Sequence, residues 1–148
     1  MNVLVIDIGG SNIKILATGQ PERIKIPSGG EFKPENLVPL VKDAAKDWAY
    51  DVISIGFPGV VKHGKIAADP VNMGNGWMGF DFQKAFGCPV KIINDAAMQA
   101  LGSYEKGKLL FMGFGTGLGT AMVFDDLILP LEGGHLPVKL GTFETHVG

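Results

Sequence analysis

The hydrophobic pattern of residues 2–18 predicts a β-hairpin. Val3–Ile8 is aliphatic except for Asp7, which is typical of a buried strand. Residues 13–17 then alternate apolar and more polar side chains, which predicts a second strand. Residues 9–12 lie between the two strands and form a turn, whose glycines permit positive φ and a close approach of another molecule to the backbone. Asp7 is therefore expected where the first strand ends.

The same pattern returns at residues 109–124. An apolar run is followed by the turn 115–117 and by a second apolar run, so the chain builds strand, glycine turn and strand twice. Glycine weakens a strand by roughly 0.5–1 kcal/mol relative to alanine. Because Gly115, Gly117 and Gly119 occur together, we expect a reason other than stability for these glycines.

Helices and strands alternate between the two hairpins. Apolar residues from Leu37 to Trp48, Leu40 among them, recur at helical spacing, which predicts a helix that starts at Pro34 or near Pro39. Residues 69–80 have no period and are expected to form a loop. The other predicted elements are strands at 22–27, 51–57, 89–93 and 127–129, a short helix from Asp81 to Phe86 ended by Gly87, and a helix at 96–104.

Both glycine turns are candidate phosphate-binding sites. Backbone N–H groups in such turns can bind phosphate oxygens, and an acid at a strand end can hold Mg²⁺ through water. An ordinary hairpin connection is the alternative for each turn. The candidate phosphate-binding residues are Gly9, Gly10, Ser11, Asn12, Lys14, Gly115, Thr116 and Gly117, with Asp7 as the candidate metal residue.

Composition excludes several classes of protein. The chain has 148 residues, 46% of them hydrophobic and 19% charged, which fits a globular protein with a substantial core. A formal net charge of −2 gives no reason to expect nucleic acid or a membrane as partner. Cys88 is the single cysteine, so neither an intrachain disulfide nor a cysteine zinc cluster is expected. Without a spanning apolar run or signal peptide, the expected location is cytoplasmic.

Three motifs make a family resemblance specific. The segments DIGGSNIK at 7–14, INDA at 93–96 and GFGTGLGT at 113–120 resemble, in order and spacing, the sugar kinases of the ROK family. This family belongs to the actin/hexokinase/Hsp70-like superfamily, and the similarity is closest to the short branch of polyphosphate/ATP glucokinases. It implies an α/β, actin-like (ribonuclease H-like) fold with a mixed sheet and flanking helices. Residues 1–107 would form the N-terminal domain and residues 108–148 the beginning of a C-terminal domain, in a truncated chain.

The resemblance also implies an activity and its residues. The expected reaction transfers a phosphoryl group from ATP or polyphosphate, with Mg²⁺, to the 6-hydroxyl of glucose or a related hexose. Asp95, between the two glycine turns, is the candidate general base. A helix cap is the alternative role for Asn94 and Asp95. The candidate sugar contacts are Asn94, Glu132, His135, Glu144, Gly59 and Asn72.

Several of these interpretations have alternatives. A simple turn is the preferred interpretation of Gly59 over a sugar contact, and Trp77 either covers the sugar or anchors its loop to the core. Most family members carry a cysteine-rich zinc loop after the histidine that corresponds to His135. Residues 136–144 contain no cysteine, as in the short branch, so no zinc is expected and His135 would act as a hydrogen-bonding group.

Two further expectations concern the whole molecule. A catalytically inactive sugar-binding or regulatory module, or a fragment, is the alternative to a kinase; repressor relatives carry an N-terminal helix-turn-helix, which a strand beginning near Asn2 argues against. The strands between residues 109 and 129 would leave one sheet face uncovered. This 148-residue form is therefore expected to self-associate, as in a homodimer, or to be the ordered part of a longer protein, and to be a poor kinase.

Overall fold

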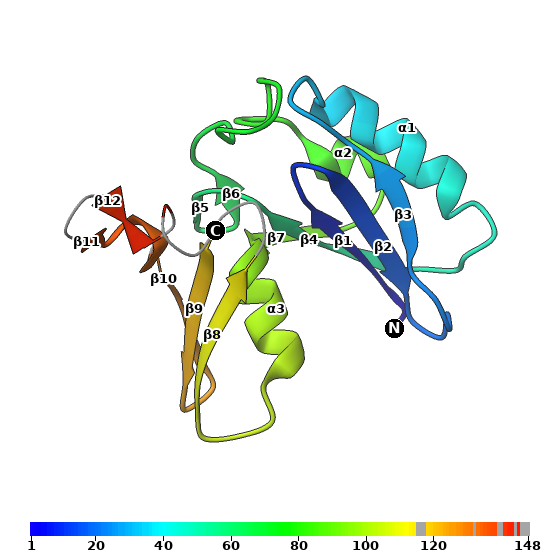
Figure 1. Ribbon diagram of the computed structural model, residues 1–148. Helices are drawn as coiled ribbons and strands as arrows, with labels where there is room; N and C mark the ends of the chain where they lie inside the picture. Colours follow the sequence, from blue (N-terminus) through cyan, green and yellow to red (C-terminus); the bar gives the residue numbers. More distant parts are fainter. Residues whose placement is uncertain (115–117, 132, 139–140, 144, 146–148) are drawn as a thin grey trace. The chain divides into compact units, whose positions relative to one another are not determined.

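The computed structural model describes residues 1–114, 118–131, 133–138, 141–143 and 145. The chain packs as two compact units, Met1–Ile93 and Asn94–Gly148 (Figure 1). These units are defined by packing within this chain. The domain boundary predicted after residue 107 concerns the longer family fold and stays a prediction.

The first unit is built on a five-stranded sheet with the strand order β3-β2-β1-β4-β7 (Figure 1). β2 pairs antiparallel with β1 and β3, whereas β1 pairs parallel with β4, so the predicted mixed sheet is confirmed. All five strands follow predicted apolar runs to within two residues at each end. Their bounds are Val3–Ile8 (β1), Asn12–Ala17 (β2), Ile24–Pro27 (β3), Val52–Phe57 (β4) and Val90–Asn94 (β7).

One face of this sheet forms the core of the first unit. Leu4, Ile6 and Ile8 of β1 are fully buried, whereas the intervening residues are half-buried, as period-two alternation requires. Helices α1 (Pro34–Ala44) and α2 (Phe82–Phe86) lie next to each other and contribute to the same hydrophobic cluster (Figure 1). The core therefore fixes the strand register and with it the position of the glycine turn that follows β1.

Helix α1 starts at Pro34 as predicted but differs in two details. It continues through Pro39 to Ala44, so this proline lies beyond the first turn. Leu37 and Val41, four residues apart, face the core, whereas Leu40 is 43% exposed. The predicted apolar face was wrong at Leu40, because that side chain lies on the flank of the buried stripe.

The remaining elements of the first unit are short. β5 (Val61–Lys62) and β6 (Lys65–Ile66) form a small hairpin that the sequence analysis did not predict. Helix α2 confirms its prediction: the Asp81 side chain accepts a hydrogen bond from Lys84 N at 2.9 Å, and Gly87 ends the helix with φ of +80°.

The second unit combines helix α3 (Asp95–Ser103) with an antiparallel sheet in the order β10-β9-β8. Asp125 and Asp126 take positive φ, as a tight hairpin turn between β9 and β10 requires. The short strands β11 and β12 were not predicted. The bounds are Lys108–Phe114 (β8), Leu118–Phe124 (β9), Leu127–Leu131 (β10), Gly133–His135 (a 3₁₀ turn), Pro137–Val138 (β11) and Gly141–Thr142 (β12).

The sheet of the second unit exposes apolar side chains on one face. Leu110, Met112 and Phe114 alternate along β8 and are 57, 48 and 64% exposed, and Leu127 of β10 is 61% exposed. The predicted apolar exposure is thus confirmed, and self-association through it stays a prediction. None of the helices in the described part of the chain has the length and apolar character needed to cross a bilayer.

Candidate active site

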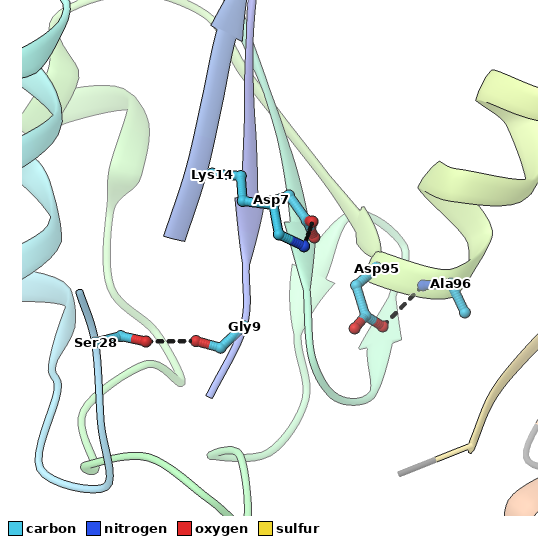
Figure 2. A network of polar contacts seen from close by, with 6 residues as sticks. All are labelled: Asp7, Gly9, Lys14, Ser28, Asp95 and Ala96. Atoms are coloured by element: carbon cyan, nitrogen blue, oxygen red, sulfur yellow. Dashed lines mark hydrogen bonds and ion pairs between the residues drawn. The ribbon is translucent and has the colours of Figure 1, made fainter. Parts of the chain in front are cut away.

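The glycine turn after β1 is held by hydrogen bonds within the first unit. Gly9 N donates to Asn12 O at 3.1 Å. Ser28 binds the turn twice: its Oγ donates to Gly9 O at 2.7 Å (Figure 2) and its N donates to Ser11 O at 3.2 Å. The sequence analysis did not single out Ser28, which lies 19 residues from Gly9 and has no motif of its own.

The turn glycines serve close packing. Neither Gly9 nor Gly10 has positive φ, so this turn does not use the left-handed backbone that its glycines permit. A Cβ on Gly9 would lie 2.9 Å from Asn12 O, which explains the glycine by the approach of the two strands. A Cβ on Gly10 would lie 3.9 Å from the Cβ of Asn72, so the structure brings a predicted sugar residue beside the predicted phosphate turn.

Asp7 and Lys14 form an ion pair on neighbouring strands. Lys14 Nζ lies 3.2 Å from Asp7 Oδ2, and the two residues are directly paired in the β1–β2 register (Figure 2). The Asp7 side chain is 18% exposed and the Lys14 side chain is 41% exposed. Solvent therefore screens the ion pair, and its contribution to stability is small. The pair instead fixes a carboxylate and an ammonium group beside the glycine turn.

The Asp7 carboxylate fits a Mg²⁺ ion that arrives with phosphates. Mg²⁺ usually keeps several waters and is bound by one or two carboxylates together with substrate phosphate oxygens. Within the described residues, no group of three or more His, Cys, Asp or Glu side chains is arranged to hold a metal alone. The chemistry of Asp7 therefore suits a metal that is shared with a ligand.

Asn94 and Asp95 mark the change from β7 to α3. The Asn94 side chain accepts a hydrogen bond from Ala97 N at 3.1 Å, so Asn94 is the N-cap of α3, as the alternative interpretation proposed. Asp95 Oδ1 accepts a hydrogen bond from Ala96 N at 2.8 Å (Figure 2). The backbone thus orients the Asp95 carboxylate while its neighbour caps the helix, and the catalytic role of Asp95 stays a prediction.

Trp77 anchors the 69–80 loop to the core. It is fully buried, and its ring centroid lies 5.6 Å from that of Phe57 and 6.4 Å from that of Phe82. Of the two interpretations offered for Trp77, the structure supports the core anchor, because a fully buried ring has no surface left for a sugar. Asn72 of the same loop is exposed.

The sequence analysis missed Asp69, which closes this loop. Asp69 Oδ1 accepts hydrogen bonds from Trp77 N at 2.7 Å and from Met78 N at 3.1 Å. The backbone N–H of Met78, together with those of Gly76 and Trp77, lowers the pKa of the Asp69 carboxyl. An Asp before a proline at the start of a glycine-rich loop is the one local signal that pointed to such a turn.

Gly59 is explained by packing. Its N–H donates to Phe57 O at 2.9 Å, and a Cβ at this position would lie 2.9 Å from Phe57 Cε1. This geometry favours the simple turn among the two interpretations, and a sugar contact at Gly59 stays a prediction.

His135 is the last residue of the Gly133–His135 turn in the second unit, and it is exposed. The predicted residues Gly115, Thr116, Gly117, Glu132 and Glu144 lie outside the described residues. Gly119 has a packing reason in the structure, because a Cβ there would lie 3.2 Å from Ala96 Cβ of α3. Thr120, the last residue of the motif at 113–120, is buried and accepts a hydrogen bond from Gly133 N, a role that was not predicted.

Comparison with known proteins identifies the family. The chain matches the ROK family over residues 3–137 and belongs to this family. It is 29% identical over 153 residues to the polyphosphate glucokinase of Mycobacterium tuberculosis, covering 90% of this chain and 57% of that protein. The polyphosphate glucokinase of Mycobacterium leprae is also 29% identical, with 47% of its length covered. The chain therefore spans about half the length of these curated relatives.

Solved structures confirm the fold. The inorganic polyphosphate/ATP-glucomannokinase of Arthrobacter sp. superposes with a TM-score of 0.81 at 28% identity, covering 97% of this chain and 67% of that one. A ROK family glucokinase from Streptomyces griseus, solved with glucose and AMPPNP, superposes with a TM-score of 0.78 at 19% identity, covering 98% and 56%. The predicted α/β, actin-like fold is thus confirmed.

Proposed function

We propose that the protein containing this chain is a sugar kinase that transfers a phosphoryl group from ATP or polyphosphate to the 6-hydroxyl of glucose or a related hexose. The ROK match over residues 3–137, which includes all three motifs, is the observation that carries the proposal. The names of its relatives support it, since they are polyphosphate glucokinases and a polyphosphate/ATP-glucomannokinase.

The donor phosphates would bind at the glycine turns. Gly9 N is already bonded to Asn12 O, so phosphate binding at the first turn would fall to Gly10, Ser11, Asn12 and Lys14. Lys14 supplies positive charge beside Asp7 at 3.2 Å. When bound, Mg²⁺ would neutralise developing charge on the phosphates, with Asp7 as its protein partner through water. The second predicted set, Gly115, Thr116 and Gly117, would act on the same donor.

The acceptor hydroxyl would meet Asp95. This carboxylate would accept the proton of the 6-hydroxyl as phosphoryl transfer proceeds. Its Oδ1 is oriented by the N–H of Ala96 at 2.8 Å, which limits the rotation of the carboxylate. Positioning of this kind, together with stabilisation of the developing charge, accounts for most of the catalysis in phosphoryl transfer. Asn72, Asn94, Gly59, Glu132, His135 and Glu144 are the proposed sugar contacts.

Two finer features complete the proposal. The cytoplasmic location expected from the sequence stays a prediction. A homodimer is supported by the apolar row Leu110, Met112 and Phe114 on the open face of the second unit.

Replacement of His135 by alanine should weaken glucose binding roughly tenfold, because a sugar hydroxyl loses its hydrogen-bond partner in a partly closed site. Calorimetric titration with glucose measures the effect. His63→Ala is the matched control, since His63 is also exposed but lies at the β5–β6 turn of the first unit. Equal affinities for both variants and the unchanged protein would remove His135 from the sugar site.

A further inference from the structure

One threonine connects the end of β10 to the turn that carries His135. Thr120 of β9 is 6% exposed and is the one buried polar residue among those the structure describes. Its Oγ1 donates a hydrogen bond to Leu131 O at 3.0 Å and accepts one from Gly133 N at 2.8 Å. A single hydroxyl therefore holds the chain at both residues that flank position 132.

The hydroxyl uses both of its hydrogen-bonding functions. Valine has nearly the same shape as threonine but would leave the N–H of Gly133 and the carbonyl of Leu131 without this partner in a partly buried place. Serine would keep both bonds. The chain therefore offers one substitution that conserves shape and another that conserves the bonds.

The backbone of the turn packs directly on the same side chain. A Cβ on Gly133 would lie 3.1 Å from both Oγ1 and Cγ2 of Thr120. Gly133 O then accepts a hydrogen bond from Leu136 N at 3.2 Å, which closes the turn after His135. The place of the turn is thus set by Thr120, while His135 itself stays exposed.

We propose that Thr120 is a positioning residue for hexose binding, which holds the Gly133–His135 turn so that His135 meets the sugar hydroxyls. This inference rests on the proposed function, because it assigns the turn to the hexose. The other role that such a bond can have is stabilisation of the sheet end alone. That role would alter the amount of folded enzyme without altering the KM for the sugar.

The test compares Thr120→Val with Thr120→Ser in the natural gene product. The valine variant should raise the KM for glucose roughly tenfold and leave kcat at saturating glucose within about threefold. The serine variant should stay within about twofold of the unchanged protein in both constants. Thr18→Val is the matched control, since the Thr18 hydroxyl also bridges an N–H and a carbonyl, both of Val3, and lies in the first unit.

A second variant, Gly133→Ala, covers the case in which Thr120→Val does not fold. Its methyl group would push the turn away from Thr120 without removing the hydroxyl, so the KM for glucose should rise. A lower kcat with unchanged KM in both variants would overturn the inference. If the unchanged protein has no turnover, the proposed function fails. The role of Thr120 is then decided by calorimetry, which compares the glucose affinities of the same variants with that of the unchanged protein. Absence of any glucose binding would overturn both.

Discussion

Asp95→Asn is expected to lower the turnover number by ~10²–10⁴-fold, the usual cost of losing a general base. Asparagine cannot accept the proton of the sugar hydroxyl, but its side-chain oxygen can still accept the hydrogen bond from Ala96 N that the carboxylate accepts at 2.8 Å. The start of α3 and the affinity for glucose should therefore be retained. Steady-state kinetics and calorimetry on the natural gene product measure the two effects separately.

Asp81→Asn is the matched control for this experiment. Asp81 also lies at a helix start, where it accepts a hydrogen bond from Lys84 N, but it caps α2 of the first unit. Its asparagine variant should keep normal turnover. Near-normal turnover of Asp95→Asn would instead exclude proton acceptance by this residue. If Asp95→Asn instead lost helical circular dichroism signal, the role of Asp95 would be limited to the start of α3.

Trp77→Ala should reduce the free energy of unfolding by about 3–5 kcal/mol, the range for removing a large buried aromatic side chain. Trp77 is fully buried between Phe57 and Phe82, so little of the cavity can be filled by rotation of exposed groups. The loop that carries Asn72 would lose its anchor at the same time. Urea denaturation followed by circular dichroism gives the change.

Two variants serve as controls for Trp77→Ala. The buried indole N–H of Trp77 has no hydrogen-bond partner in the described part of the chain. Trp77→Phe therefore removes an unpaired donor along with some contact area, and should cost less than half as much as alanine. Trp48→Ala should also cost less, because Trp48 is only partly buried. A cost below about 1 kcal/mol for Trp77→Ala would contradict the anchor role.

The sequence predicted the elements whose pattern is decided locally. The strands at Val3–Ile8 and Val52–Phe57 follow from runs of apolar residues. Asp81 and Gly87 marked the two ends of α2 because caps act within one helical turn.

Tertiary packing decided what the sequence did not predict. Leu40 fits the helical period but is 43% exposed, because only the stripe through Leu37 and Val41 meets the hydrophobic core. The two-residue strands β5, β6, β11 and β12 are too short to produce a period. Gly9 was assigned to phosphate binding, whereas the structure explains this glycine by a close contact with Asn12 O.

The candidate site shows the same division. Its predicted residues were identified from sequence motifs, whereas the residues that hydrogen-bond to them were identified only from the fold. Ser28 binds Gly9 across 19 positions and Thr120 binds Gly133 across 13. Neither spacing belongs to a helix or strand period, so no sequence signal pointed to these two hydrogen bonds, although Thr120 itself is the last residue of the motif at 113–120.

Phosphoryl transfer to a hexose is the central claim, and ³¹P NMR of the reaction tests it most directly. The natural gene product is incubated with glucose, Mg²⁺ and either ATP or polyphosphate. The incubation is then repeated once with the metal chelated and once with the Asp95→Asn variant. We expect a hexose 6-phosphate signal with at least one donor, and its loss in both repeats. Glucose binding without any phosphorylated hexose would contradict the claim and favour a sugar-binding module. Donor hydrolysis without sugar phosphate would also contradict the claim and would favour an ATPase.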